Sequence, residues 1–161
     1  MLKIGFQIKE HVIRKVFSKK VKYPGKSHLE VRYDNKTGKK ISPERIWDIA
    51  PSEAIKWDIY GAKINEFIGF NDPPDYDAEN YLDPFDVVHE AAFILSKRLS
   101  CNVDFVNGIF DFYINTSGNS KNYISLSEIT KLNKKIFDLQ KRIQKLGLEA
   151  GEPRVFESTD D

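Results

Sequence analysis

The sequence has very little cysteine and no long apolar run. Its 161 residues include one cysteine, Cys101, which excludes a disulfide framework and a cysteine-based zinc site within the chain. The longest unbroken apolar run, residues 91–95, has five members, far short of the roughly 20 that a membrane-spanning helix needs. Lys3, Lys9 and Glu10 interrupt the first ten residues, unlike a secretory leader. We therefore expect a protein of the cytoplasm with no membrane attachment.

The common short motifs of catalysis are also missing. There is no GxGxxG, no GxxxxGK[ST] and no GxSxG, the usual signatures of nucleotide binding and of α/β-hydrolases. His89 and Glu90 begin an HExxH pattern, but Phe93 occupies the position of the second zinc-binding histidine. The nearest histidine to Cys101 lies twelve residues earlier, so nothing local marks the thiol as a nucleophile. The sequence predicts no catalytic residues, no metal and no cofactor.

The net charge of +1 conceals a segregation of charge along the chain. Residues 1–40 hold twelve Lys or Arg and three acids, whereas residues 41–92 hold three basic residues and twelve acids. Such segregation is typical of polar recognition of a partner. The alternative is that the two blocks belong to one folded unit and partly neutralise each other across a sheet.

Alternating apolar residues and turn residues predict several hairpins. Strands are expected at 2–9, at 29–33 with a return through 39–41, at 55–60 with a partner at 64–70, and at 103–105 with a return at 109–114. Asn107-Gly108 fits a tight two-residue turn. The stretch 12–17 fits either a strand or a helical turn. Ser42-Pro43-Glu44 predicts a short helix that ends before Pro51.

Two longer amphipathic helices are predicted in the second half of the chain. Asp83 as cap and Pro84 as first residue begin a helix that runs to about Leu99. Ser125 to Glu128 fits a capping box, and apolar residues from Ile129 to Leu146 follow at steps of three and four. That stripe suits either one face of the domain's own core or a coiled-coil dimer. We expect the first, and so a monomer.

The predicted fold class is α+β. The sequence indicates an antiparallel sheet of hairpins with two long amphipathic helices packed on one face, within a single domain of residues 1–151. The composition of residues 152–161 predicts a flexible acidic tail.

The acidic stretch before the first long helix is a candidate site. Acids at spacings one, three, five, nine and twelve from Asp75 to Asp86 imitate a calcium loop, but Asn80 replaces the turning glycine. The alternatives are a calcium site, a solvated loop without a ligand and a partner-binding loop. In the last case aromatic area and anionic acceptors would face a basic partner. The expected contact residues are Asp72, Asp75, Tyr76, Asp77, Glu79 and Tyr81.

The segment from Asp83-Pro84-Phe85-Asp86 through Leu99 to Asp104-Phe105, with the hairpin that follows, resembles small α+β immunity proteins of bacterial polymorphic and contact-dependent toxin systems. The resemblance covers about a quarter of the chain. It implies a non-enzymatic protein that neutralises a cognate toxin domain by direct binding, here one with a basic surface such as a nuclease. The near-neutral total charge departs from the acidic balance of many nuclease inhibitors, which leaves the class of toxin open.

A nucleic-acid-binding module is the alternative function. Basic side chains would contact phosphates and aromatic rings would stack on bases, although the acidic block opposes such binding. The residues concerned are Lys15, Lys19, Lys20, Lys22, Lys26, Arg32, Lys36, Lys39 and Lys40, with Phe17, Tyr23 and Tyr33.

Overall fold

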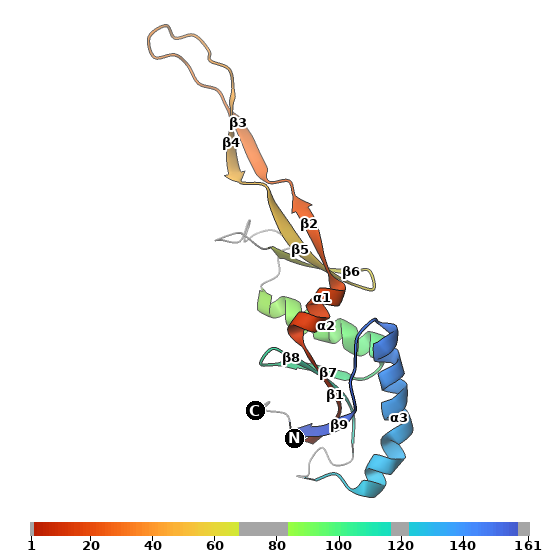
Figure 1. Ribbon diagram of the computed structural model, residues 1–161. Coiled ribbons are helices and arrows are strands. Elements are labelled where there is room, and N and C mark those ends of the chain that lie inside the picture. Colours follow the sequence, from red (N-terminus) through yellow and green to blue (C-terminus); the bar gives the residue numbers. More distant parts are fainter. Residues whose placement is uncertain (1, 68–83, 117–122, 158–161) are drawn as a thin grey trace.

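The computed structural model describes residues 2–67, 84–116 and 123–157 (Figure 1). It is an α+β protein with antiparallel sheets, which confirms the predicted class. No helix in these ranges is long and apolar enough to span a membrane. The elements in chain order are β1 (Leu2–Lys9), α1 (Glu10–Phe17), β2 (Ser18–Tyr23), β3 (Lys26–Glu30), β4 (Glu44–Ile49), β5 (Ser52–Ile59), β6 (Ala62–Phe67), α2 (Pro84–Leu99), β7 (Asn102–Val106), β8 (Ile109–Ile114), α3 (Leu126–Lys145) and β9 (Arg154–Glu157).

A four-stranded sheet forms the base of the molecule, in the order β7-β8-β1-β9. The predicted hairpin at Asn107-Gly108 joins β7 to β8, and both residues have the positive φ that this turn requires. The alternating residues of β1 and β8 explain why the sheet has one apolar face, because every second side chain points to the same side. Ile4, Phe6 and Phe112 on that side are buried in one core cluster with residues of α2 and α3.

The two predicted long helices are present as α2 and α3. Ser125 caps α3, where its hydroxyl accepts a hydrogen bond from the Glu128 amide at 3.2 Å. In the predicted stripe Ile136, Leu139 and Ile143 are buried. The stripe therefore packs in the chain's own core, the first of the two alternatives.

The stretch that fitted either a strand or a helical turn is helical. It forms α1, in which the Arg14 guanidinium pairs with the Glu10 carboxylate one turn away at 2.6 Å. Ile13 and Phe17 face the core, so α1 ties the four-stranded sheet to the strands that follow it.

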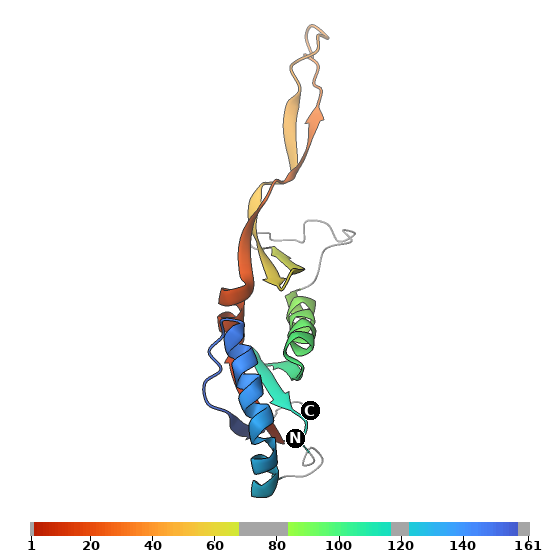
Figure 2. The ribbon, with the colours of Figure 1, turned by 90° about the vertical axis from the view of Figure 1, so that its right-hand side faces the viewer.

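The second sheet continues into a projecting ribbon. Strands β2, β5 and β6 form a three-stranded antiparallel sheet in the order β2-β5-β6. Farther along the same hairpin β3 pairs with β4. We name residues 18–59 the hairpin arm and residues 26–49 the distal arm. Figures 1 and 2 show from two directions that the distal arm extends away from the body of the molecule.

The structure corrects three of the sequence predictions. The short helix expected from Ser42 is strand β4, because pairing with β3 satisfies its backbone groups along the ribbon and Pro51 leaves too few residues for a helix. The strands form separate sheets rather than one. Residues 154–157 of the expected flexible tail are β9, whose backbone pairs with the outer edge of β1.

Candidate functional site

The predicted acidic contact loop lies outside the described residues. Asp72, Asp75, Tyr76, Asp77, Glu79 and Tyr81 all fall there. Asp83, the predicted helix cap, also lies outside the described residues. Both the partner-binding loop and the calcium site that was its alternative therefore stay predictions.

No residue of the distal arm is buried, whereas the base of the hairpin arm contributes Trp57 and Ile59 to the core. Gly25 sets the bend between its two parts, because its φ is +79° and an added Cβ would lie 2.7 Å from the carbonyl oxygen of Ile49. The neighbouring Pro24 and Pro51 interrupt the pairing at the same level. The distal arm therefore leaves the three-stranded sheet as a free two-stranded ribbon.

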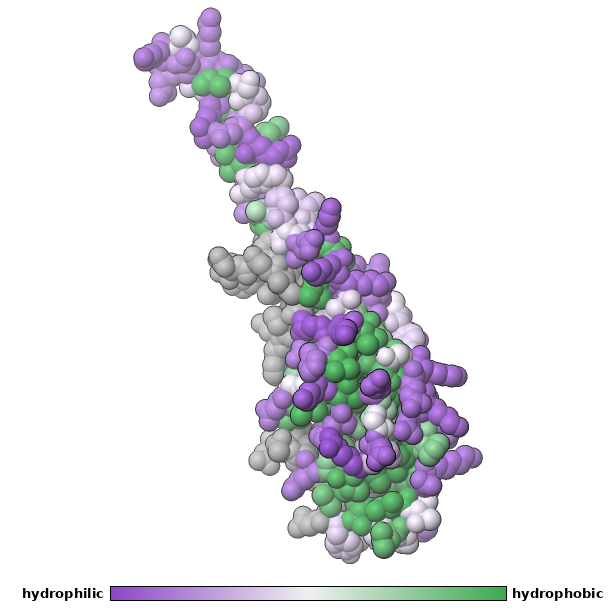
Figure 3. Space-filling view, in the orientation of Figure 1, coloured by the Kyte–Doolittle hydropathy of each residue, from purple (hydrophilic) through white to green (hydrophobic). Residues whose placement is uncertain are grey.

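One face of the distal arm carries apolar and aromatic side chains. Ser27 lies opposite Trp47 and Leu29 lies opposite Arg45, and residues directly opposite each other share a face. Leu29 is 60% exposed and Trp47 is 46% exposed, with the Arg45 guanidinium 5.8 Å from the Trp47 ring. Figure 3 shows small hydrophobic areas on the arm, separated by hydrophilic residues. We name Leu29, Val31, Tyr33 and Trp47, all exposed, the arm stripe.

The opposite face of the distal arm is polar and centred on His28. Its Nδ1 lies 2.9 Å from Asp48 and its Nε2 lies 3.1 Å from Glu30. These hydrogen bonds, that to Asp48 first, raise the pKa of His28 above its ordinary value of 6.5. Next to this cluster Arg32 pairs with Glu44 at 2.9 Å.

The cations and acids of the arm are unequally matched. Each acid of the distal arm is engaged: Glu30 and Asp48 by His28, Glu44 by Arg32, and Asp34 by the Lys36 amide. The three lysines at the tip form no ion pair with any residue that the structure describes. They are Lys36, Lys39 and Lys40.

At the base of the arm the basic and acidic blocks of the sequence meet. Lys22 lies opposite Glu53 across β2 and β5, and the Lys19 ammonium lies 3.6 Å from Asp58. The blocks thus partly neutralise each other across a sheet, as one of the two alternatives predicted. Part of the excess positive charge of the arm lies at its tip, on Lys36, Lys39 and Lys40.

The structure divides the residues proposed for nucleic-acid binding. It brings all of the basic ones except Lys15 onto the arm, whereas Lys15 lies on α1. Of the three aromatic residues, Phe17 is buried and cannot stack on a base, Tyr23 is half-buried, and Tyr33 is 63% exposed.

Sequence reasoning missed Arg45 and Trp47, because the Ser-Pro-Glu pattern was interpreted as a helix start. The signal that could have found them is composition, because Ile46, Trp47 and Ile49 are β-branched or aromatic residues of the kind enriched in strands.

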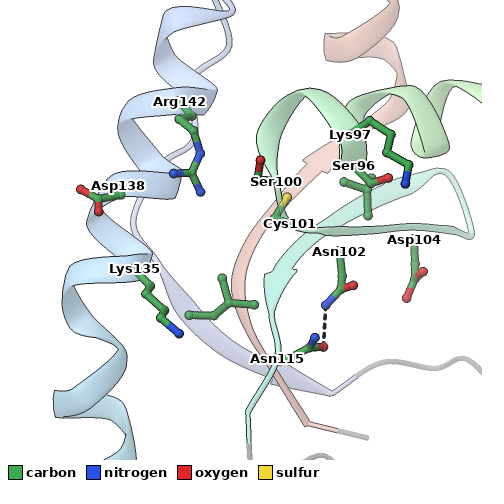
Figure 4. A pocket seen from close by; sticks show the side chains of 12 residues that line it. Ser96, Lys97, Ser100, Cys101, Asn102, Asp104, Asn115, Lys135, Asp138 and Arg142 are labelled. Carbon is green, nitrogen blue, oxygen red and sulfur yellow. Dashed lines mark hydrogen bonds between the residues drawn. The ribbon is translucent and has the colours of Figure 1, made fainter.

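A polar cleft lies between α2, β7 and α3 (Figure 4). Its volume is about 760 Å³. On the α3 side the cleft is lined by Lys135, Asp138 and Arg142, and Lys97 lies on the α2 side. Within it the side-chain Nδ2 of Asn102 donates a hydrogen bond to the side-chain Oδ1 of Asn115 at 2.6 Å.

Cys101 also lines this cleft, but its thiol is poorly placed for nucleophilic chemistry. Burial raises the pKa of Cys101 to about 12, although the Arg142 guanidinium nearby acts to lower it. The thiolate is the reactive form. In the described part of the chain there is no group of three or more His, Cys, Asp or Glu side chains that could hold a metal ion.

A buried polar network covers the other face of the four-stranded sheet. The Lys3 ammonium lies 2.9 Å from Asp104 and 3.3 Å from Asp111. Tyr113 donates to Asp104 at 2.7 Å, and Gln7 donates to Asp111 at 3.0 Å. The charges of this network are paired internally, as buried charges must be.

Comparisons with models of protein families, with curated proteins and with solved structures gave no match.

Proposed function

We propose that this chain is a non-enzymatic binding protein that contacts its partner through the distal arm. The observation that supports this proposal is the arm stripe, whose four apolar and aromatic side chains are exposed on a projecting ribbon, with Leu29 and Trp47 on the same face of it. Exposed apolar residues scattered singly are ordinary, whereas a contiguous exposed patch marks an interaction site. Trp and Tyr are also the residues that most often dominate the energy of an interface.

A protein is the partner that suits the stripe best. Burying Leu29, Val31 and Trp47 against a complementary groove removes apolar area from water, and the open edges of β3 and β4 can pair with a partner strand. Following the resemblance to immunity proteins, we propose a toxin domain as that partner. The acidic loop at 72–83 remains a second proposed contact, for a basic part of the same toxin domain.

Nucleic acid is a second candidate partner, favoured by the tip. Lys36, Lys39 and Lys40 have no acidic partner among the described residues, and a two-stranded ribbon fits the major groove of a duplex. Such binding would weaken steeply as salt rises.

The test compares two faces of the same ribbon. One variant changes the stripe (Leu29→Ser, Tyr33→Ser and Trp47→Ser), and a matched control changes the polar face (His28→Ser and Ile46→Ser). All of these side chains except the half-buried Ile46 are exposed, so both variants should keep the circular dichroism spectrum of the natural protein. The partner to be tested is the product of the reading frame immediately upstream, which the proposal expects to carry a toxin domain, and binding is measured by calorimetric titration and by survival on co-expression.

We expect the stripe variant to weaken binding at least tenfold and the control to change it little, because buried aromatic anchors carry most interface energy. If both variants bind the partner as tightly as the natural protein does, the interface lies elsewhere than on the arm. A mobility-shift series with duplex DNA at about 50 mM salt tests the second candidate. Binding that is lost when Lys36, Lys39 and Lys40 become Gln would favour nucleic acid over the toxin domain.

A further inference from the structure

We propose that the cleft between α2, β7 and α3 binds a small phosphate-bearing molecule, which Lys135 and Arg142 hold by its phosphate. This site is separate from the distal arm, so the inference does not depend on the function proposed above.

The two cations lie on one face of one helix. Lys135 and Arg142 are seven positions apart on α3, which is about two turns, and both line the cleft. In Figure 4 both side chains extend from α3 on the side of the cleft, Arg142 at the level of Ser100 and Cys101 and Lys135 at the level of Asn115. Neither forms an ion pair with another described residue, so their charge is available to a ligand.

Arg142 is held in place before any ligand binds. Its Nε donates a hydrogen bond to the carbonyl oxygen of Leu99 at 2.8 Å. The two terminal nitrogens of the guanidinium have no hydrogen bond to the described residues. A planar guanidinium that is already oriented loses little freedom when it binds phosphate oxygens. The same hydrogen bond occupies one of the last carbonyls of α2, at the negative end of that helix, which would otherwise disfavour an anion.

The two carboxylates of the cleft leave it with a positive balance. Asp104 already accepts from Lys3 at 2.9 Å and from Tyr113 at 2.7 Å, so its charge is compensated from behind the cleft. Asp138 is exposed, and in Figure 4 its carboxylate points away from Lys135 and Arg142. Lys97 adds a third cation from the α2 side.

The rest of the lining suits a hydrophilic ligand. The Asn102 and Asn115 amides and the Ser96 and Ser100 hydroxyls line the cleft, whose volume of about 760 Å³ lies in the usual range for small-ligand sites. Polar groups of this kind would bind the hydroxyls of a sugar or polyol, while the cations hold its phosphate. Two cations favour a phosphate over a carboxylate, because a phosphate presents more oxygens to them.

The test uses inorganic phosphate and glycerol phosphate as probes. Backbone amide shifts of residues 100–102 and of Asn115 are followed by NMR during each titration, at constant ionic strength. Lys135→Glu is compared with Lys134→Glu, which makes the same charge change one residue away at a position that does not line the cleft. Both lysines are exposed, so neither change should disturb the fold.

We expect saturable shifts for the natural protein and a loss of affinity of about tenfold or more in Lys135→Glu, since a charged hydrogen bond to the ligand is removed. Lys134→Glu should stay within about twofold. A variant in the arm stripe should bind both probes normally, which keeps failure here distinct from failure of the proposed function.

Three results would overturn the proposal. The first is no saturable shift up to roughly 10 mM of either probe, weaker than a useful metabolite site. The second is equal weakening by both substitutions, which would indicate diffuse attraction. The third is binding of a single-stranded oligonucleotide without binding of the small probes, because the phosphate would then belong to a nucleic-acid chain.

Discussion

Lys3 and Asp104 are 101 positions apart in the sequence, yet the Lys3 ammonium lies 2.9 Å from the Asp104 carboxylate. They meet because β1 and β7 are the two neighbours of β8. The Lys3 side chain is fully buried and also faces Asp111 at 3.3 Å, while the Tyr113 ring lies 4.4 Å from the ammonium. A single cation thus compensates carboxylates from two strands.

Replacing Lys3 by Met should destabilise the protein strongly. The change leaves two carboxylates without their cation, and breaking a buried pair in this way costs about 3 kcal/mol or more. Asp104 is about one-third exposed, so most of the cost should come from Asp111. Urea unfolding followed by circular dichroism measures the change in free energy of unfolding.

Two further variants control this prediction. Lys9→Met, at the exposed end of the same strand, should change the free energy of unfolding by less than about 0.5 kcal/mol. Adding Asp104→Asn and Asp111→Asn to Lys3→Met should recover part of the loss, because the orphaned charges are then gone. A Lys3→Met variant as stable as the natural protein would show that the network is not a stabilising element.

The sequence predicted the elements whose signal is local. Strand β1, the turn at Asn107-Gly108 and the capped helix α3 each follow from a period or a cap within a few residues. The helix expected at Ser42 failed because the same residues gain more from pairing with β3 than from about two isolated helical turns. A local pattern carries no information on that choice.

The sites depend on which elements meet, and this the sequence did not reveal. The arm stripe is exposed because, among the described strands, β3 and β4 pair with each other alone, beyond the bend at Gly25. The cleft exists because the end of α2 lies beside Arg142 of α3, 43 positions away from Leu99. Residues 154–157 looked like a charged tail, and only the open edge of β1 makes them a strand.

His28 should titrate above its ordinary pKa. Its protonated form is favoured by hydrogen bonds to Asp48 and, secondly, to Glu30, which raise its pKa. This contribution to stability is fully present below pH 6.5 and is lost as the pH rises through the raised pKa of the folded protein. NMR titration of the imidazole protons gives the midpoint directly.

The same NMR titration can separate the contributions of Asp48 and Glu30 to the pKa of His28. Asp48→Asn should lower the midpoint of His28 more than Glu30→Gln does, because Asp48 is the larger cause of the shift. A His28 midpoint unaffected by Asp48→Asn would contradict the hydrogen-bonded arrangement on the polar face of the arm.

Cys101 should resist alkylation in the folded protein. Burial raises the pKa of its thiol to about 12, so at pH 8 the reactive thiolate is scarce. Iodoacetamide should label folded Cys101 roughly a hundredfold more slowly, or slower still, than the same thiol in urea. Mass spectrometry of timed samples measures both rates, and similar rates in the two states would show that the thiol is accessible and ionisable.

Leu139 should be essential for the stability of a monomer. It is fully buried between Ile136 and Ile143 on the apolar side of α3, so Leu139→Ala should lower the free energy of unfolding by roughly 2 to 5 kcal/mol. Leu126→Ala, at a position that is 82% exposed on the same helix, should cost far less. Because the stripe packs within one chain, the melting temperature of the natural protein should not depend on its concentration. Light scattering that reports a dimer, together with a melting temperature that rises with concentration, would show instead that the helix also serves an interface between chains.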